Sequence, residues 1–118
     1  MRIEIDADAG NPPYAQIRDQ VAAQARDGVL TAGTRLPAVR ALAGELGVAV
    51  NTVARAYREL ELAGLVETRG RHGTVITARA AGASQEALRL AGQYATAMRA
   101  LGVPPDQALD LARAALGL

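Results

Sequence analysis

The fold is decided by residues 34–64, whose sequence is TRLPAVRALAGELGVAVNTVARAYRELELAG. Apolar residues recur in this stretch at helical spacing in two sets, Val39, Leu42, Ala43 and Leu46, then Val53, Ala56, Tyr57 and Leu60. Each set follows the i, i+3, i+4, i+7 pattern of a helix that buries one face. Gly47 lies between the sets, where a left-handed residue ends a helix. The stretch therefore predicts a helix from Pro37 or Ala38, a tight turn and a second helix near 49–63, the anatomy of a helix-turn-helix.

The residues after Gly64 predict a β-hairpin. Residues 65–69 and 74–77 have the composition of short strands. The four residues Gly70-Arg71-His72-Gly73 between them are typical of a turn. The sequence also allows a short strand at 34–36. A hairpin directly after a helix-turn-helix predicts a wing, whose tip we place at 69–74.

The N-terminal residues predict one strand and one helix. Arg2 to Asp6 alternates polar and apolar residues, as in a strand with one buried face. Pro12 and Pro13 then open a helix that Gly28 ends. The apolar face of this helix consists of Tyr14, Ile17, Val21 and Ala25.

Residues 80–118 predict a linker and two helices. Ala80 to Ala83 is the linker, Ser84 caps a helix that reaches Leu101, and a second helix runs from about Asp106 to Leu116. The apolar seam of the two helices comprises Ala87, Ala91, Tyr94, Met98, Leu101, Leu109, Ala112 and Leu116. Helices this short bury too little surface to be stable alone. We expect the seam to form a homodimer; the alternative is that it packs on the first helix of the chain.

These elements define the fold class as mainly α with a small β component. We expect a winged helix-turn-helix domain at 1–79 and a two-helix dimerisation tail at 80–118. The composition excludes other classes. There is no cysteine and only one histidine, so no thiolate or multi-histidine metal site can form. Without a phosphate-loop lysine or a nucleophile elbow, we expect no enzyme and no cofactor.

The sequence also bears on location. No apolar stretch approaches the roughly 20 residues that cross a membrane, and residues 1–8 do not form the apolar run of a signal peptide. We therefore expect a cytoplasmic protein without a membrane partner.

Positive charge is concentrated in the middle of the chain. Residues 35–79 hold seven arginines and four glutamates, whereas residues 1–34 hold three arginines and five acids. All 13 basic side chains are arginine. This usage suits bidentate contacts with phosphate or guanine, although the codon bias of a GC-rich genome would produce the same preference. The distribution, more than the net charge of +1, is compatible with a nucleic-acid partner.

The second helix of the helix-turn-helix presents a candidate reading face. With its apolar stripe buried, Asn51, Arg55 and Arg58 point outward and Thr52 lies on the flank. Asn and Arg hydrogen-bond adenine and guanine edges in the major groove, and the first turns of this helix reach those edges in helix-turn-helix proteins. The alternative is a solvated helix face on which Asn51 serves as the helix cap.

Further basic residues flank this face. Arg35 and Arg40 lie on either side of Pro37, and Arg40 is near a helix start, where phosphate is favoured. An ion pair of Arg40 with Glu45 is the alternative. Three basic residues at the hairpin tip, Arg69, Arg71 and His72, could enter a minor groove or lie on phosphates.

Several short motifs stand at fixed spacing, namely the run from Gly33 to Ala43, Leu46-Gly47-Val48, Asn51-Thr52-Val53, Arg55-Ala56-Tyr57, Leu60, Gly64-Leu65-Val66 and Gly73-Thr74-Val75. From about Pro13 to Thr77 the chain thereby resembles the DNA-binding domain of the GntR family. The resemblance implies operator contacts by Arg35, Arg40, Asn51, Thr52, Arg55 and Gly73. It also implies a dimeric repressor at a palindromic operator, and the short tail resembles the YtrA-like branch, whose two C-terminal helices dimerise.

The chain departs from the family pattern at several positions. Ala38 and Ala49 stand where serine is common, which weakens two helix caps. Val50 replaces a frequent Arg or Pro, and Arg71 stands where the first wing glycine often lies. Two alternatives from other classes are a winged-helix protein-interaction module, which the low net charge would permit, and a small-molecule sensor with a pocket at the dimer interface. The sequence does not indicate which small molecule such a sensor would bind.

Overall fold

Five α-helices and a two-stranded sheet make up the chain in the computed structural model, which describes residues 1–118. Their bounds are α1 Pro13–Arg26, α2 Val39–Leu46, α3 Val50–Leu62, β1 Val66–Thr68, β2 Thr74–Ile76, α4 Gln85–Ala100 and α5 Pro105–Leu116. The residues form two compact units, 1–83 and 84–118. The predicted class, mainly α with a small sheet and a winged helix-turn-helix, is confirmed.

The helix-turn-helix consists of α2 and α3. Gly47 ends α2 in the left-handed conformation, with φ 68° and ψ 33°, as the sequence predicts. Every residue of the second predicted stripe, Val53, Ala56, Tyr57 and Leu60, is buried. Helix α2 begins at Val39, later than predicted, because Ala38 keeps an extended backbone. The Pro37 carbonyl is also held outside the helix, where it accepts a 2.7 Å hydrogen bond from the Tyr57 hydroxyl.

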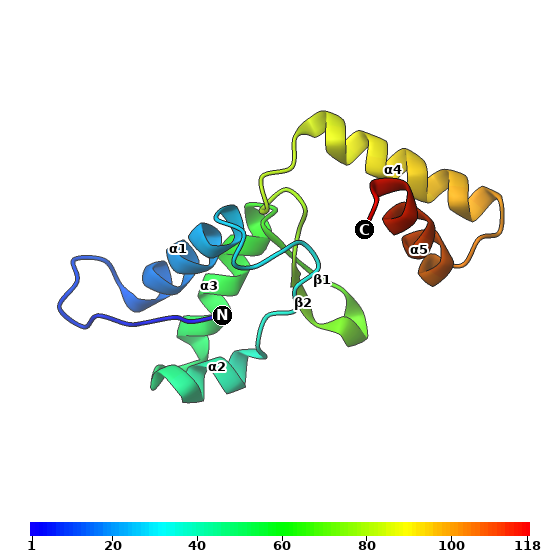
Figure 1. The fold of residues 1–118 in the computed structure, drawn as a ribbon. Coiled ribbons are helices and arrows are strands. Elements are labelled where there is room, and N and C mark those ends of the chain that lie inside the picture. The colour runs from blue at the N-terminus through cyan, green and yellow to red at the C-terminus, as the bar shows by residue number, and fades with distance from the viewer. The chain divides into compact units, whose positions relative to one another are not determined.

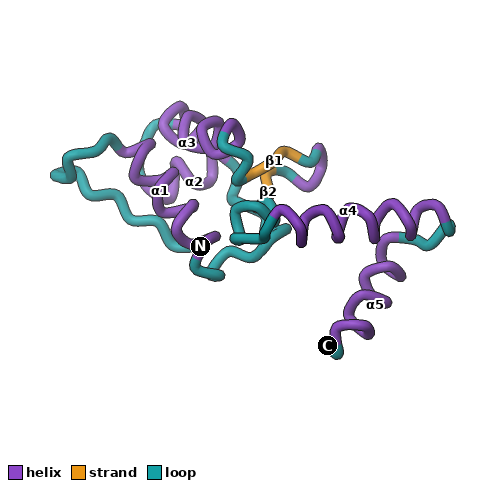
Figure 2. The backbone as a smooth tube through the Cα atoms, turned by 90° about the horizontal axis from the view of Figure 1, so that it is seen from above, coloured by secondary structure: helices purple, strands orange, loops and turns teal.

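Helix α1 supports α3 from behind. The two helices lie side by side in both views (Figures 1 and 2) and share the core of the first unit. Ile17 and Val21 of α1 and Val53 and Leu60 of α3 are almost completely buried there. Burial of each such side chain stabilises the fold by about 1.5–3 kcal/mol. The exposed face of α3 is therefore carried on a rigid, apolar base.

The prediction of a strand at Arg2–Asp6 is wrong. The segment is extended, but its backbone hydrogen-bonds to glutamine side chains of α1 and not to a neighbouring strand. Gln20 of α1 accepts from the Glu4 amide at 3.0 Å and donates to its carbonyl at 2.7 Å. Gln16 forms the same two bonds with Asp6, at 2.8 and 2.9 Å. Gln24 donates to the Arg2 carbonyl at 2.6 Å. The alternation itself is real, since Ile3 is buried and Ile5 packs against the core.

The wing is an antiparallel hairpin that joins the core. Val66 pairs with Ile76 and Thr68 with Thr74, and both Val66 and Ile76 are buried. The short strand considered at 34–36 is reduced to one bridge, between Arg35 and Val75. Both predicted strands of the hairpin are present but shorter than the sequence suggests. The bridge fixes Arg35 beside the wing.

Ala80 does not belong to a free linker. It is buried in the core of the first unit, and its amide donates to the Thr77 hydroxyl at 3.2 Å. That hydroxyl in turn donates to the Gly64 carbonyl at 2.8 Å. These bonds hold the chain against the core beyond Arg79, because a buried apolar methyl and two hydrogen bonds favour the folded turn over an extended linker.

The second unit is a helical hairpin of α4 and α5. The Ser84 hydroxyl caps α4 by accepting from the Ala87 amide at 3.1 Å, as predicted. The Tyr94 hydroxyl donates to the Ala108 carbonyl at 2.6 Å and ties the two helices together. Neither helix contains a buried residue. No helix in either unit is long and apolar enough to span a bilayer.

We expect the Tyr57 hydroxyl to lose its proton at a higher pH than an exposed tyrosine does. Burial raises its pKa to about 12, because the interior disfavours the phenolate. The folded-state pKa lies above the unfolded value of about 10, so the stability from this group is complete below pH 10 and is lost as the pH rises toward 12. Ultraviolet titration of a Tyr14→Phe/Tyr94→Phe variant, in which Tyr57 is the only tyrosine, measures this directly. A midpoint near 10 in the folded protein would contradict the buried position.

Candidate nucleic-acid interface

The outward face of α3 carries the residues assigned to base reading. Asn51, Arg55 and Arg58 are exposed, and Thr52 is half-buried on the flank. Asn51 does not cap the helix, since the N-cap is Ala49 and no side chain bonds to the first turn. This excludes the alternative of Asn51 as a cap. Its amide is left with both its donor and its acceptor available.

Arg55 is held in place by two neighbours. Its guanidinium carbon lies 3.7 Å from the centre of the Tyr14 ring, within the range of a cation–π contact. Its Nε donates to Glu59 Oε2 at 3.3 Å. Glu59 also accepts from Arg18 Nη1 at 2.6 Å. The network connects the reading face of α3 to α1.

The charged groups of this network shift each other's pKa values. The Arg18 hydrogen bond lowers the pKa of Glu59 more than partial burial raises it, and Arg55 lowers it further. Hydrogen bonds to Asp19 and then Glu59 raise the pKa of the Arg18 guanidinium. Glu59 is therefore ionised at neutral pH, and its negative charge lies on the face where a polyanion would bind.

Four of the six arginines expected to contact DNA have no acidic partner. Arg35, Arg40, Arg58 and Arg71 are exposed, and no ion pair of the structure includes them. The alternative pairing of Arg40 with Glu45 does not form. Unpaired exposed arginines keep their full charge for phosphate oxygens.

The amino ends of α2 and α3 are also left open. Their N-cap residues, Ala38 and Ala49, provide no side-chain hydrogen bond, and neither first turn contains an acid. Backbone N–H groups at a helix start then lack partners, and the helix dipole favours an anion there. The two departures from serine at these positions leave the N–H groups free to meet phosphate.

The tip of the wing is a short 3₁₀ turn at Gly70–His72. The positive φ angles fall on Gly70 (49°) and Gly73 (68°), so Arg71 needs no strained backbone. Gly73 has ψ −149°, a conformation that side chains disfavour. A Cβ there would also lie 3.2 Å from Arg35 Nε. The missing side chain thus lets the wing backbone approach Arg35.

Basic side chains gather between Arg35 and the turn of the wing. A pocket of about 290 Å³ is lined by Gly33, Arg35, Arg69, His72 and Val75. Arg69 also forms an ion pair with Glu67, whereas Arg35 has no acidic partner. The pocket has the size and charge to accept a phosphate group, since guanidinium groups bind its oxygens by charge-assisted hydrogen bonds.

Sequence reasoning missed Tyr14 and Glu59 as parts of this surface. Tyr14 was assigned to the core, but it is only half-buried and supports Arg55. The spacing of Arg55 and Glu59, i and i+4 on one helix, was the available signal for their ion pair. Arg18 left no comparable signal, because its partner Glu59 lies 41 residues away in the chain.

The residues assigned to dimerisation fall into two groups in the second unit. Tyr94, Met98, Leu109 and Ala112 line an apolar groove of about 330 Å³ between α4 and α5. Ala87, Ala91, Leu101 and Leu116 remain exposed, with exposed fractions of 74% for Leu101 and 73% for Leu116. The hairpin thus covers only part of its apolar surface.

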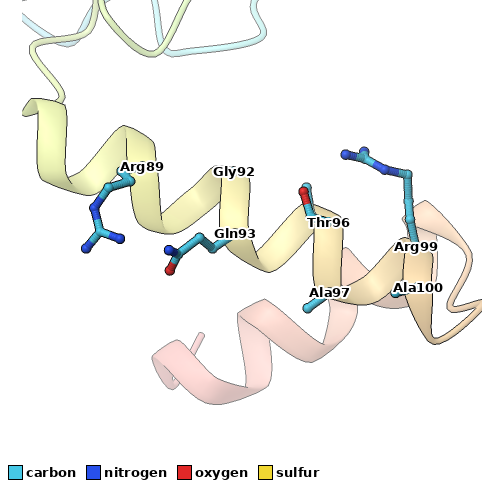
Figure 3. A pocket seen from close by; sticks show the side chains of 8 residues that line it. Arg89, Gly92, Gln93, Thr96, Ala97, Arg99 and Ala100 are labelled. Carbon is cyan, nitrogen blue, oxygen red and sulfur yellow. The ribbon is translucent and has the colours of Figure 1, made fainter.

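The face of α4 opposite the seam combines polar and small side chains. Figure 3 shows Arg89, Gln93 and Thr96 on it together with Gly92 and Ala100. Arg89 pairs with Glu86 on the same helix. A hollow on this face is lined by α4 residues alone, and one helix cannot enclose a ligand as binding pockets do. The residues of this face include no large apolar side chain, in contrast to the seam.

The fold and the surface around α3 define a winged helix-turn-helix protein of the DNA-binding class. Residues 13–76 match the family described as bacterial regulatory proteins, gntR family. The chain belongs to the GntR family of transcriptional regulators. The resemblance seen in the sequence is thereby confirmed over nearly the whole predicted range.

Individual relatives agree with this assignment. The HTH-type transcriptional regulator Rv1152 of Mycobacterium tuberculosis is 50% identical over 107 residues, which cover 91% of this chain and 88% of that protein. The HTH-type transcriptional repressor YtrA of Bacillus subtilis is 40% identical over 66% of this chain and 60% of its own length. The structure of YtrA from Sulfolobus acidocaldarius, a GntR-family transcription factor, has a TM-score of 0.61 and 32% identity over 80% of this chain and 97% of that one. The likeness to the short YtrA-like branch extends into the tail.

Proposed function

We propose that this protein is a dimeric repressor that binds a palindromic operator in double-stranded DNA. The observation that carries the proposal is the outward face of α3, where Asn51 and Arg58 are exposed and free of intramolecular partners. A similar protein, YtrA of Bacillus subtilis, is named a repressor. A bound operator would place the protein with the chromosome, in the cytoplasm.

The residues of the interface divide into three groups. Asn51, Thr52, Arg55 and Arg58 lie on the recognition helix and would read base edges in the major groove. Arg35 and Arg40, with the open helix starts, would bind phosphates and fix the orientation of the domain. Arg69, Arg71, His72 and the Gly73 backbone would place the wing on the adjacent backbone or minor groove.

Dimerisation would proceed through the tail. Exposed leucines on a helix pair without any buried residue are typical of a face that a second copy covers. A two-fold dimer uses the same patch on both subunits. Its two reading helices would then bind half-sites that repeat with the helical turn of DNA.

Selection from random DNA duplexes tests the proposal. The full-length protein should enrich a sequence with two inverted half-sites, and it should bind that duplex about 10³-fold or more tightly than unrelated DNA at physiological salt. Enrichment of no sequence above background would contradict a sequence-specific regulator. Enrichment of a single half-site without a symmetric partner would contradict the dimer alone.

A further inference from the structure

We propose that Tyr14 and Glu59 are positioning residues, which hold the Arg55 guanidinium so that its free edge reads a guanine in the operator. This inference rests on the proposed function. Neither residue was among those expected from the sequence to contact DNA.

The geometry leaves Arg55 one edge for a ligand. The Tyr14 ring lies 3.7 Å below the guanidinium carbon, and Glu59 takes the Nε edge at 3.3 Å. The two terminal nitrogens have no partner among the hydrogen bonds of the structure, and 56% of the side chain remains exposed. A guanidinium that presents its terminal nitrogens side by side matches the O6 and N7 acceptors of guanine.

The Glu59 carboxylate that holds Arg55 is itself held in place by Arg18. Glu59 is only 30% exposed and is also bound by Arg18, whose Nη1 lies 2.6 Å from Oε1. Arg18 comes from α1, one turn after Tyr14, and its guanidinium lies 5.9 Å from the same ring. Ring, carboxylate and second arginine therefore restrict Arg55 before DNA arrives, which reduces the entropy lost on binding.

Glu59 has a second effect on selectivity. Its charge lies beside Arg55, so a phosphate that approaches Arg55 is repelled by the carboxylate. A guanine edge has no net charge, so the carboxylate repels it much less than it repels a phosphate. The pair thus favours base contact over phosphate contact, and Arg55 should contribute more to specific than to non-specific binding.

A double-mutant cycle tests the positioning role, with the duplex recovered by selection and an unrelated duplex as probes. Tyr14→Leu removes the aromatic face and should weaken binding of the selected duplex by about three- to tenfold, with little change for unrelated DNA. Tyr14→Phe keeps the ring and should bind like the wild type. In an Arg55→Ala background, Tyr14→Leu should have no further effect, because the residue that it positions is absent. An equal loss in both backgrounds would show a purely structural role and overturn the proposal.

Glu59→Gln provides an independent test that does not depend on the stability of the Tyr14 variants. Loss of the charge should raise affinity for unrelated DNA by about three- to tenfold and lower the ratio of specific to non-specific affinity. An unchanged ratio would contradict the proposal. Failure to select any sequence would instead contradict the proposed function, so the two failures are distinguishable.

Discussion

A chain that ends at Ala83 is expected to be monomeric and to bind the operator about 10²–10⁴-fold more weakly than the full-length protein. The reason is effective concentration: when two domains are joined, the second half-site is bound in an intramolecular step. The exposed leucines of α4 and α5 provide the apolar surface for the dimer interface. Ala83 is the appropriate end point because Ala80 belongs to the core of the first unit.

Analytical ultracentrifugation measures the association, and gel shift on the selected duplex measures the affinity. The shortened chain should retain cooperative thermal unfolding, since the first unit keeps its core. A Leu101→Asp/Leu116→Asp variant should reproduce the effect in the full-length protein, whereas Gln93→Ala on the face of α4 opposite the seam should not. A shortened chain that still sediments as a dimer would place the interface in the first unit and refute the role of the tail.

The core of the fold was predictable because helical spacing shows directly which side chains are buried. The apolar stripes predicted the helices α1, α2 and α3 and their buried faces, and Gly47 predicted the turn between α2 and α3. The way in which the extended N-terminal segment is held was not predictable. Its alternation indicated one buried face, but no pattern of spacing reveals that Gln16 and Gln20 would replace a neighbouring strand.

The candidate site divides in the same way. Periodicity identified the outward residues of α3, because exposure follows from the position of the buried stripe. It did not reveal that Arg55 is restrained while Arg58 is free, since this depends on the Tyr14 ring of another helix. Likewise, Ala80 looked like a linker residue, and its burial depends on the path of the chain after β2.

Asn51→Ala is expected to weaken binding of the selected duplex by about 1–3 kcal/mol, with little change for unrelated DNA. Asn51 is exposed in the first turn of α3 and has no partner within the protein. Alanine also favours the helix more than asparagine does. The substitution should therefore keep or raise the thermal stability of the protein, and a loss of affinity cannot be attributed to unfolding.

Leu62→Ala is the matched control for this variant. Leu62 lies on the same helix, is 82% exposed and carries no charge, but it stands at the end of α3 distant from the first turn. Its substitution should change neither affinity. Isothermal titration with both duplexes compares the variants, and an equal loss for both duplexes with Asn51→Ala would indicate a phosphate contact in place of base reading.

Parallel selections from random duplexes with the wild type and Asn51→Ala test whether the first turns of α3 read the operator sequence. The variant should recover the same inverted half-sites with the preference lost at one base pair in each, at symmetric positions. Recovery of an identical motif, with every position as strongly preferred as in the wild type, would contradict it.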